Sequence, residues 1–151
     1  MKLIRHSYLL LALLAFTGCE TDPVFPDQPR ISFVSITPEV ATAFAADEVK
    51  VTIRYEDGDG DLGYVGDPVN NLFLTDLRAA FVGNPGRVSG YSFESLTPDT
   101  KNPSIQGEIT VTLTTPPYDP AEEPLTFEVY LVDRAGHESN RITTTGITIQ
   151  Q

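Results

Sequence analysis

Residues 49–56 read VKVTIRYE, and this stretch identifies the kind of fold that the chain adopts. Valine, isoleucine and tyrosine occupy every second position, and lysine, threonine, arginine and glutamate lie between them. An alternation with period two is typical of a β-strand with one buried and one solvated face. The same pattern returns in residues 109–114, ITVTLT, and in residues 125–132, LTFEVYLV. These three segments therefore predict strands.

Further strand candidates extend the pattern over most of the chain. They are residues 31–36, 72–77, 88–93 and 142–149, the last containing Ile147 and Ile149. Proline and glycine separate the segments, and no segment shows a helical stripe of apolar residues. About seven short strands in residues 31–151 predict an all-β, immunoglobulin-like antiparallel β-sandwich. A jelly roll or a small barrel is the alternative.

The N-terminus has the layout of an export signal. Lys2 and Arg5 precede residues 9–16, LLLALLAF, an apolar run too short to span a bilayer. The run ends in Phe16, Thr17, Gly18 and Cys19, which resembles the lipobox of bacterial lipoproteins, although Phe16 stands where leucine is usual. We therefore expect a signal peptide at residues 1–18, a lipidated Cys19 with a proline-rich tether at residues 19–30, and a folded domain at residues 31–151.

The lipobox resemblance implies where the protein is found and how it is held there. In that family the cysteine thiol is diacylated, and the signal is cut just before it. Several acyl chains give stable membrane anchoring. The expected location is the cell envelope, as an outer-membrane lipoprotein, and the leaflet stays open. Pro23, Pro26 and Pro29 recur every third residue and favour an extended tether between the anchor and the domain.

Composition excludes several classes of function. The chain has 10 basic and 21 acidic residues. Without Lys2 and Arg5, which belong to the signal, 8 basic residues remain, so the mature net charge is −13. This charge argues against nucleic acid as a partner and favours cations or basic partners. Cys19 is the only cysteine, and His137 is the only histidine after the signal, which leaves few means of nucleophilic catalysis.

The sharpest motif is EDGDGDLG at residues 56–63. Its aspartates Asp57, Asp59 and Asp61 are separated by single glycines. In a straight strand alternate side chains lie about 6.6 Å apart, which is too far to share one ion. Glycines let the chain curl and bring the carboxylates together. The segment is not an EF-hand, since the sixth position from Asp57 is Leu62 rather than glycine.

A second polar segment, DRAGHESN at residues 133–140, follows a strong predicted strand. In an immunoglobulin-like lettering, residues 49–55 form strand B, residues 125–132 strand F and residues 142–149 strand G. The B–C and F–G loops then lie at the same pole. Carboxylates gathered there repel one another unless a cation neutralises them, so we predict a Ca²⁺ site. The predicted ligands are Asp57, Asp59, Asp61, Asp133 and Glu138. Further oxygens could come from Asp67, Asn70, Asn71 and Asn140.

An alternative interpretation of both segments stays open. Asp-Gly is also a common turn dipeptide, so the two motifs could be solvated turns without an ion.

Together the two loop motifs resemble immunoglobulin-like or cadherin-like domains of Bacteroidota lipoproteins. The resemblance rests on DGDGDLG after a strand and on a later D-x-A-G-x-x-S element formed by Asp133, Ala135, Gly136 and Ser139. It implies the sandwich fold and a surface or periplasmic setting, but it defines no activity. Where the usual form has asparagine, this chain has His137.

These observations predict a non-enzymatic binding or structural module, such as an accessory subunit of an outer-membrane complex with a protein partner in the envelope. A carbohydrate-binding or adhesive module is the alternative, because sugars stack on aromatic faces. The candidate residues for that role are Tyr64, Tyr91, Tyr118 and Tyr130. A hydrolase is the third possibility, and it fits less well because the acidic cluster lies in a glycine-rich loop rather than in a sheltered site.

Overall fold

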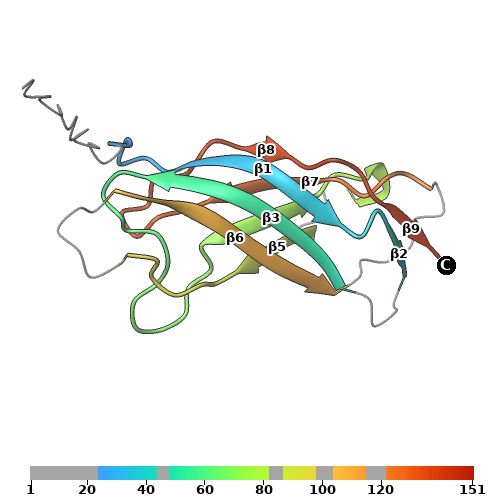
Figure 1. Ribbon diagram of the computed structural model, residues 1–151. Coiled ribbons are helices and arrows are strands. Elements are labelled where there is room, and N and C mark those ends of the chain that lie inside the picture. Colours follow the sequence, from blue (N-terminus) through green and yellow to red (C-terminus); the bar gives the residue numbers. More distant parts are fainter. Residues whose placement is uncertain (1–23, 44–47, 82–86, 98–103, 115–121) are drawn as a thin grey trace, which may run out of the picture.

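The computed structural model describes residues 24–43, 48–81, 87–97, 104–114 and 122–151. Within them lie nine strands and one turn of 3₁₀-helix, η1, at Ala79–Phe81 (Figure 1). The strands are β1 Arg30–Thr37, β2 Val40–Thr42, β3 Glu48–Asp57, β4 Leu72–Asp76, β5 Val88–Tyr91, β6 Ile105–Thr114, β7 Phe127–Leu131, β8 Ile142–Thr143 and β9 Thr148–Gln150. The predicted signal peptide, Cys19, the first part of the predicted tether and Tyr118 lie outside the described residues.

The strands form two antiparallel sheets and one small parallel pair. One sheet has the order β1-β3-β6, the other has the order β5-β4-β7-β8, and β2 pairs with β9 in parallel. The prediction of an all-β fold built on antiparallel sheets is confirmed. The alternating segments that predicted strands at residues 49–55 and 109–113 lie side by side, with Ile53 opposite Ile109 and Val51 opposite Val111.

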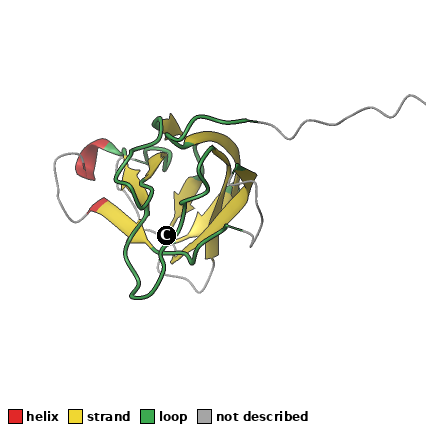
Figure 2. Cartoon of the chain, turned by 90° about the vertical axis from the view of Figure 1, so that its left-hand side faces the viewer, coloured by secondary structure: helices red, strands yellow, loops and turns green. Residues whose placement is uncertain are grey.

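One hydrophobic core joins the two sheets. Val51 and Ile53 of β3 belong to the same buried cluster as Leu74 of β4 and Val129 of β7. The buried faces of the sheets therefore pack against each other, an arrangement consistent with the predicted β-sandwich. Figure 2 looks along the strands and shows the loops that close the near end.

The C-terminal segment differs from the single strand expected at residues 142–149. Ile142 pairs with Val129 in the four-stranded sheet, whereas Ile149 pairs with Ala41 of β2. Between them the Thr144 hydroxyl accepts the backbone N–H of Phe127, and the Thr144 N–H donates to the Phe127 carbonyl. Ile147 still pairs with Leu125, just before β7, and the chain changes partner only at Thr148, which lies opposite Val40 of β2 and whose N–H donates to the Glu39 carbonyl. This split and the short β2 raise the strand number above the seven expected.

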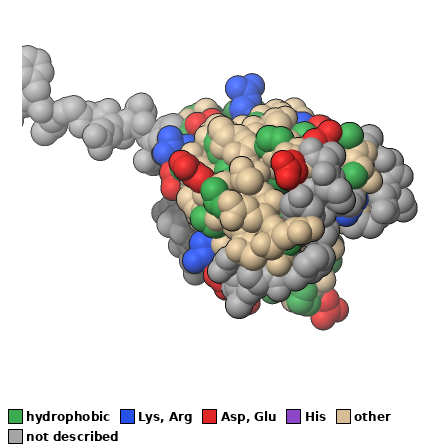
Figure 3. All heavy atoms as spheres, turned by 90° about the vertical axis from the view of Figure 1, so that its right-hand side faces the viewer, with side chains coloured by type: hydrophobic (Ala, Val, Ile, Leu, Met, Phe, Trp, Pro, Cys, Tyr) green, Lys and Arg blue, Asp and Glu red, His purple; other side chains and the backbone are tan. Residues whose placement is uncertain are grey.

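The two ends of the domain carry different features. At one end β3 stops at Asp57, opposite Ile105 at the start of β6, and the N-terminal chain enters there (Figure 1). At the other end lie β2, β9 and the C-terminus. Figure 3 views the molecule from that second end, where acidic side chains are scattered rather than gathered. In the described part of the chain, no helix has the length and apolar character needed to cross a membrane.

Candidate metal site

Asp57 ends a strand whose alternation carries its side chain inward. Val49, Val51, Ile53 and Tyr55 are buried on the core face of β3, and Asp57 continues that face. The residue is 0 % exposed, and neither of its carboxylate oxygens has a hydrogen-bond partner. A buried carboxylate without donors is costly, since it has lost the water that would solvate its charge.

The loop after Asp57 turns back toward it. Gly60 and Gly63 have φ values of 68° and 87°, in the left-handed region that glycine adopts without a steric penalty. Between them, Leu62 is completely buried in the core and anchors the loop. The Thr97 hydroxyl donates to the Gly60 carbonyl, and the Leu96 N–H donates to the Leu62 carbonyl. The buried side chain of Leu62 and the hydrogen bonds from residues 96 and 97 therefore hold the loop in its curled shape.

This curl brings the three predicted aspartates together. Asp57, Asp59 and Asp61 each offer one carboxylate oxygen, and these oxygens lie within 4.8 Å of one another. Calcium binds oxygens at about 2.3–2.6 Å, so oxygens on the same ion can be up to about 5 Å apart. Asp57 is buried, Asp61 is partly buried and Asp59 is exposed. The aspartate cluster therefore has a buried side at Asp57 and a solvent-exposed side at Asp59.

The cluster is electrostatically strained without a cation. Burial, together with the charges of Asp59, Asp61 and Asp133, raises the pKa of Asp57 to about 6. The backbone N–H of Asp61 approaches Asp57 and lowers the pKa slightly, although it does not reach hydrogen-bonding geometry. Burial also raises the pKa of Asp61, with Asp133 and Asp59 adding to the effect. A divalent cation would relieve this repulsion.

The two acidic loops meet, as the sequence predicted. The Ala135 N–H donates to Asp61 Oδ2 at 2.9 Å, and the Arg134 N–H donates to the Asp61 carbonyl at 3.3 Å. Asp61 Oδ1 stays buried without a hydrogen-bond partner. We call this end of the domain, formed by residues 57–71 and 133–140, the acidic pole.

Asp133 and Glu138, the other two predicted ligands, make contacts of their own. Asp133 Oδ1 accepts the His137 N–H at 2.7 Å, and Asp133 Oδ2 lies 2.9 Å from His137 Nδ1. Glu138 Oε2 accepts a bond from Arg141 at 3.1 Å. The metal-ligating group within the described residues contains neither of them. Asp133 therefore acts on the cluster through its charge, and its role as a ligand stays a prediction.

Two of the three side-chain amides considered as extra ligands, Asn71 and Asn140, are also engaged. Asn71 is buried, and its amide bonds to both the N–H and the carbonyl of Phe93. Asn140 bonds in the same way to Ile31, accepting its N–H at 2.8 Å and donating to its carbonyl at 2.9 Å. Both side chains bridge backbone segments. Asp67 is exposed and lies outside the aspartate group.

Two contacts of the acidic pole were not predicted from the sequence. Arg134 Nη1 donates to the carbonyls of Leu62 and Gly63, so it holds the loop from outside and lowers the pKa of Asp61. The end of the tether also contacts the acidic pole. The Gly58 N–H donates to the Pro26 carbonyl at 2.8 Å, and a Cβ at Gly58 would lie 2.3 Å from the Phe25 carbonyl oxygen. Of these two contacts, only that of Arg134 could have been suspected from the sequence, because Arg134 lies within the D-R-A-G segment.

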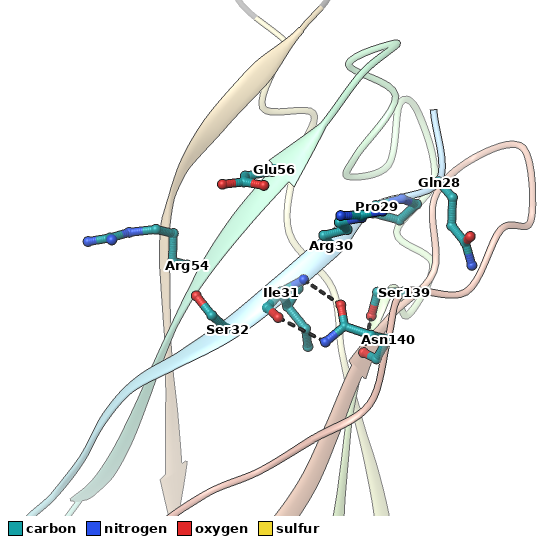
Figure 4. Close-up of a pocket in the computed structure, with 9 residues that line it drawn as sticks. All are labelled: Gln28, Pro29, Arg30, Ile31, Ser32, Arg54, Glu56, Ser139 and Asn140. Carbon is teal, nitrogen blue, oxygen red and sulfur yellow. Dashed lines mark hydrogen bonds between the residues drawn. The ribbon is translucent and has the colours of Figure 1, made fainter. Parts of the chain in front are cut away.

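The tether contact continues toward β1. Gln28 Nε2 donates to the Glu138 carbonyl at 2.7 Å, and Pro29 is buried. Figure 4 shows the groove of about 590 Å³ that runs along this segment and the start of β1. Residues 25–29 thus lie against both loops of the acidic pole. The described end of the tether is therefore part of the folded domain.

Two of the tyrosines proposed as a glycan platform, Tyr130 and Tyr91, are engaged in packing contacts, and the carbohydrate-binding role stays a prediction. Tyr130 stacks on Phe73 at a ring-centroid distance of 4.9 Å, and the Arg141 guanidinium lies 3.9 Å from the same ring centre. Phe73 belongs to β4 and Arg141 immediately precedes β8, so the Tyr130 ring is in contact with residues from both segments that adjoin β7. Tyr91 packs against the core, and burial raises its pKa.

Comparison with known proteins adds no further constraint. No protein-family model matches the chain, and neither a curated protein nor a solved structure matches it.

The geometry of the acidic pole fits a hard divalent cation. Calcium prefers carboxylate oxygens, and its flexible coordination suits a loop with one exposed side. Three buried oxygens, two on Asp57 and one on Asp61, lack any hydrogen-bond partner. Nitrogen or sulfur ligands, which other metals prefer, are absent from this group of residues.

Proposed function

We propose that this chain is a lipid-anchored, non-enzymatic module of the bacterial outer membrane. It acts as an accessory subunit that binds a protein partner, and Ca²⁺ at the acidic pole stabilises its loops. One observation carries the calcium part of the proposal. The carboxylate of Asp57 is fully buried beside two other aspartates, and neither of its oxygens meets a hydrogen-bond donor.

The ion would have a structural role. Asp57 belongs to β3, Asp61 contacts the turn at residues 133–140 through Ala135, and Gly58 contacts the tether through Pro26. A cation held by the three aspartates would fix the point at which these segments meet. Rigid loops at one end of a sandwich are the usual position of a binding surface.

A non-enzymatic role is supported by the contacts of the one histidine after the signal. His137 and Asp133 form a pair of the kind found in catalytic triads. The nearby Ser139 hydroxyl, however, donates to the Asn140 carbonyl and accepts the Leu131 N–H. Ser139 is buried and bonded to the backbone, so it is not poised as a nucleophile.

A thermal melt of the full mature chain tests the calcium site. We expect Ca²⁺ to raise the melting temperature by several degrees relative to EDTA, since a ligand at a hundred times its Kd adds about 2.7 kcal/mol. Mg²⁺ at equal ionic strength should have a smaller effect. Asp59→Asn should remove the calcium response, and Asp67→Asn, in the same loop but outside the cluster, should keep it. Identical melts in EDTA and in millimolar Ca²⁺ would contradict the proposal.

The lipid anchor has a separate test in cells. Cys19→Ser should leave a precursor that still carries residues 1–18, because lipoprotein processing requires the modified cysteine thiol. Processing is followed by the size of the protein on a gel, and anchoring is followed by its partition into the membrane fraction. Unchanged processing and membrane retention in Cys19→Ser would show that the chain is not a lipoprotein.

A further inference from the structure

Among the described residues, the two larger sheets have four edge strands, and two of these are very short. β1 and β6 flank the three-stranded sheet, and β5 and β8 flank the four-stranded sheet. An open edge presents unpaired N–H and carbonyl groups that can pair with another chain. Proteins limit this with short strands, bulges, prolines or lysines at the edge. β5 has four residues and β8 has two, so neither offers a long template.

The edge of β1 is protected in another way. Its pairing with β3 shifts register between Phe33 and Ser35, which is a bulge that interrupts the regular ladder. The Asn140 side chain also occupies both the N–H and the carbonyl of Ile31 (Figure 4). A further strand therefore cannot add to β1 without displacing Asn140.

β6 carries none of these protections. All ten of its residues pair with β3 without a register shift, and no other described strand pairs with it. Its sequence, IQGEITVTLT, contains no proline or lysine and is rich in β-branched residues. Its one charge, Glu108, is paired with Arg54 of β3 at 2.9 Å. The strand forms the free margin of the three-stranded sheet in Figure 1.

We infer that the edge of β6 is a strand-pairing surface whose partner is a second copy of this chain, joined antiparallel about a two-fold axis at Thr110. In this register Ile109 lies opposite Val111 and Glu108 opposite Thr112, so no like charges face each other. Thr110 pairs with its own copy, which is a favourable cross-strand pair. The inference does not depend on calcium or on the lipid anchor.

The self-complementary register favours a second copy over an unrelated peptide. A two-fold contact uses the same surface on both chains and closes at the dimer. The other edges of the two larger sheets are short or blocked, and β2 and β9 have three residues each, so the described strands offer no second long edge from which a filament could grow. Antiparallel pairing also places the two acidic poles at opposite ends of the joined sheet, because each pole adjoins Ile105 of its own copy.

Cysteine cross-linking in the full-length chain tests the inference. Directly opposed residues of an antiparallel pair have Cα atoms about 4.5–5.5 Å apart, which a disulfide can span. Thr110→Cys should therefore give a disulfide-linked dimer on a non-reducing gel after mild oxidation of cells. Thr52→Cys is the matched control, because Thr52 lies beside Thr110 on β3 and would be about 14 Å from its copy.

A charge variant supplies an independent measurement. Thr110→Lys places two ammonium groups opposite each other only in the dimer, so the detergent-solubilised full chain should change from two copies to one in analytical ultracentrifugation. Since Thr110 is exposed, the substitution should leave the fold intact, which the far-UV circular dichroism spectrum of the variant checks. The inference is overturned if Thr110→Cys forms no dimer, if Thr52→Cys cross-links equally, or if Thr110→Cys links to a different protein.

Discussion

Replacing Asp76 with asparagine is expected to lower the free energy of unfolding by about 3–5 kcal/mol, the usual effect of breaking a buried ion pair. Asp76 and Arg78 are 4 % and 2 % exposed, and Arg78 Nη2 lies 2.6 Å from Asp76 Oδ2. Arg78 Nε and the Arg78 backbone N–H both bond to Asp76 Oδ1 at 3.1 Å. Arg87 Nη1 approaches the same carboxylate at 3.4 Å. The substitution removes the negative charge that faces both guanidinium groups.

Urea unfolding of the full mature chain measures this effect at constant m-value. Glu108→Gln is the matched control, since it breaks an ion pair of 2.9 Å whose partners are exposed. Exposed pairs contribute about 0–1 kcal/mol because water and salt screen them. Equal losses in the two variants would mean that the Asp76–Arg78 pair does not hold the end of β4.

Replacing Asp57 with asparagine is expected to have opposite effects with and without calcium. At pH 7 the wild-type carboxyl is ionised although its folded pKa is about 6. A group with a raised folded pKa stabilises the fold fully only below its unfolded pKa, 3.8, and this contribution is lost as the pH rises through about 6. In EDTA at pH 7, the neutral amide should therefore raise the free energy of unfolding by about 1–3 kcal/mol.

In saturating Ca²⁺ the order of stability should reverse. The asparagine variant loses one carboxylate ligand and its charge, so its melting temperature should not respond to the ion, whereas that of the wild type rises. Asp67→Asn, which changes an exposed acid in the same loop, should behave like the wild type in both buffers. A variant that is less stable than the wild type in EDTA and still responds to Ca²⁺ would show that Asp57 is not part of the site.

The strands and the meeting of the acidic loops could be predicted from the sequence because both follow from local rules. The alternation at residues 49–56 fixes which side chains of β3 face inward, and Asp57 continues this inward face. The glycines of EDGDGDLG allowed the curl that brings Asp57, Asp59 and Asp61 together. The strand order of an antiparallel sandwich then put residues 133–140 at the same end.

The same local rule could have identified a further buried group. Leu72, Leu74 and Asp76 face inward along β4, and Arg78 continues the period of two. The pattern predicts that Asp76 and Arg78 share a side, but only the packing of neighbouring segments shows that this side is sealed from water. The sequence therefore indicates that Asp76 and Arg78 can pair, but it does not show that the pair is buried, and the burial is what gives the pair a large effect on stability.

The remaining features were decided by contacts between distant segments. His137 contacts both carboxylate oxygens of Asp133, and Arg141 donates to Glu138. No described group donates a hydrogen bond to the carboxylate of Asp57. Phe73 and Arg141 both pack on the ring of Tyr130. The sequence by itself determined which residues are acidic, which faces are apolar and where the chain can turn. Only the tertiary structure decided which carboxylates keep free oxygens, because that depends on which donors the other segments bring within about 3 Å.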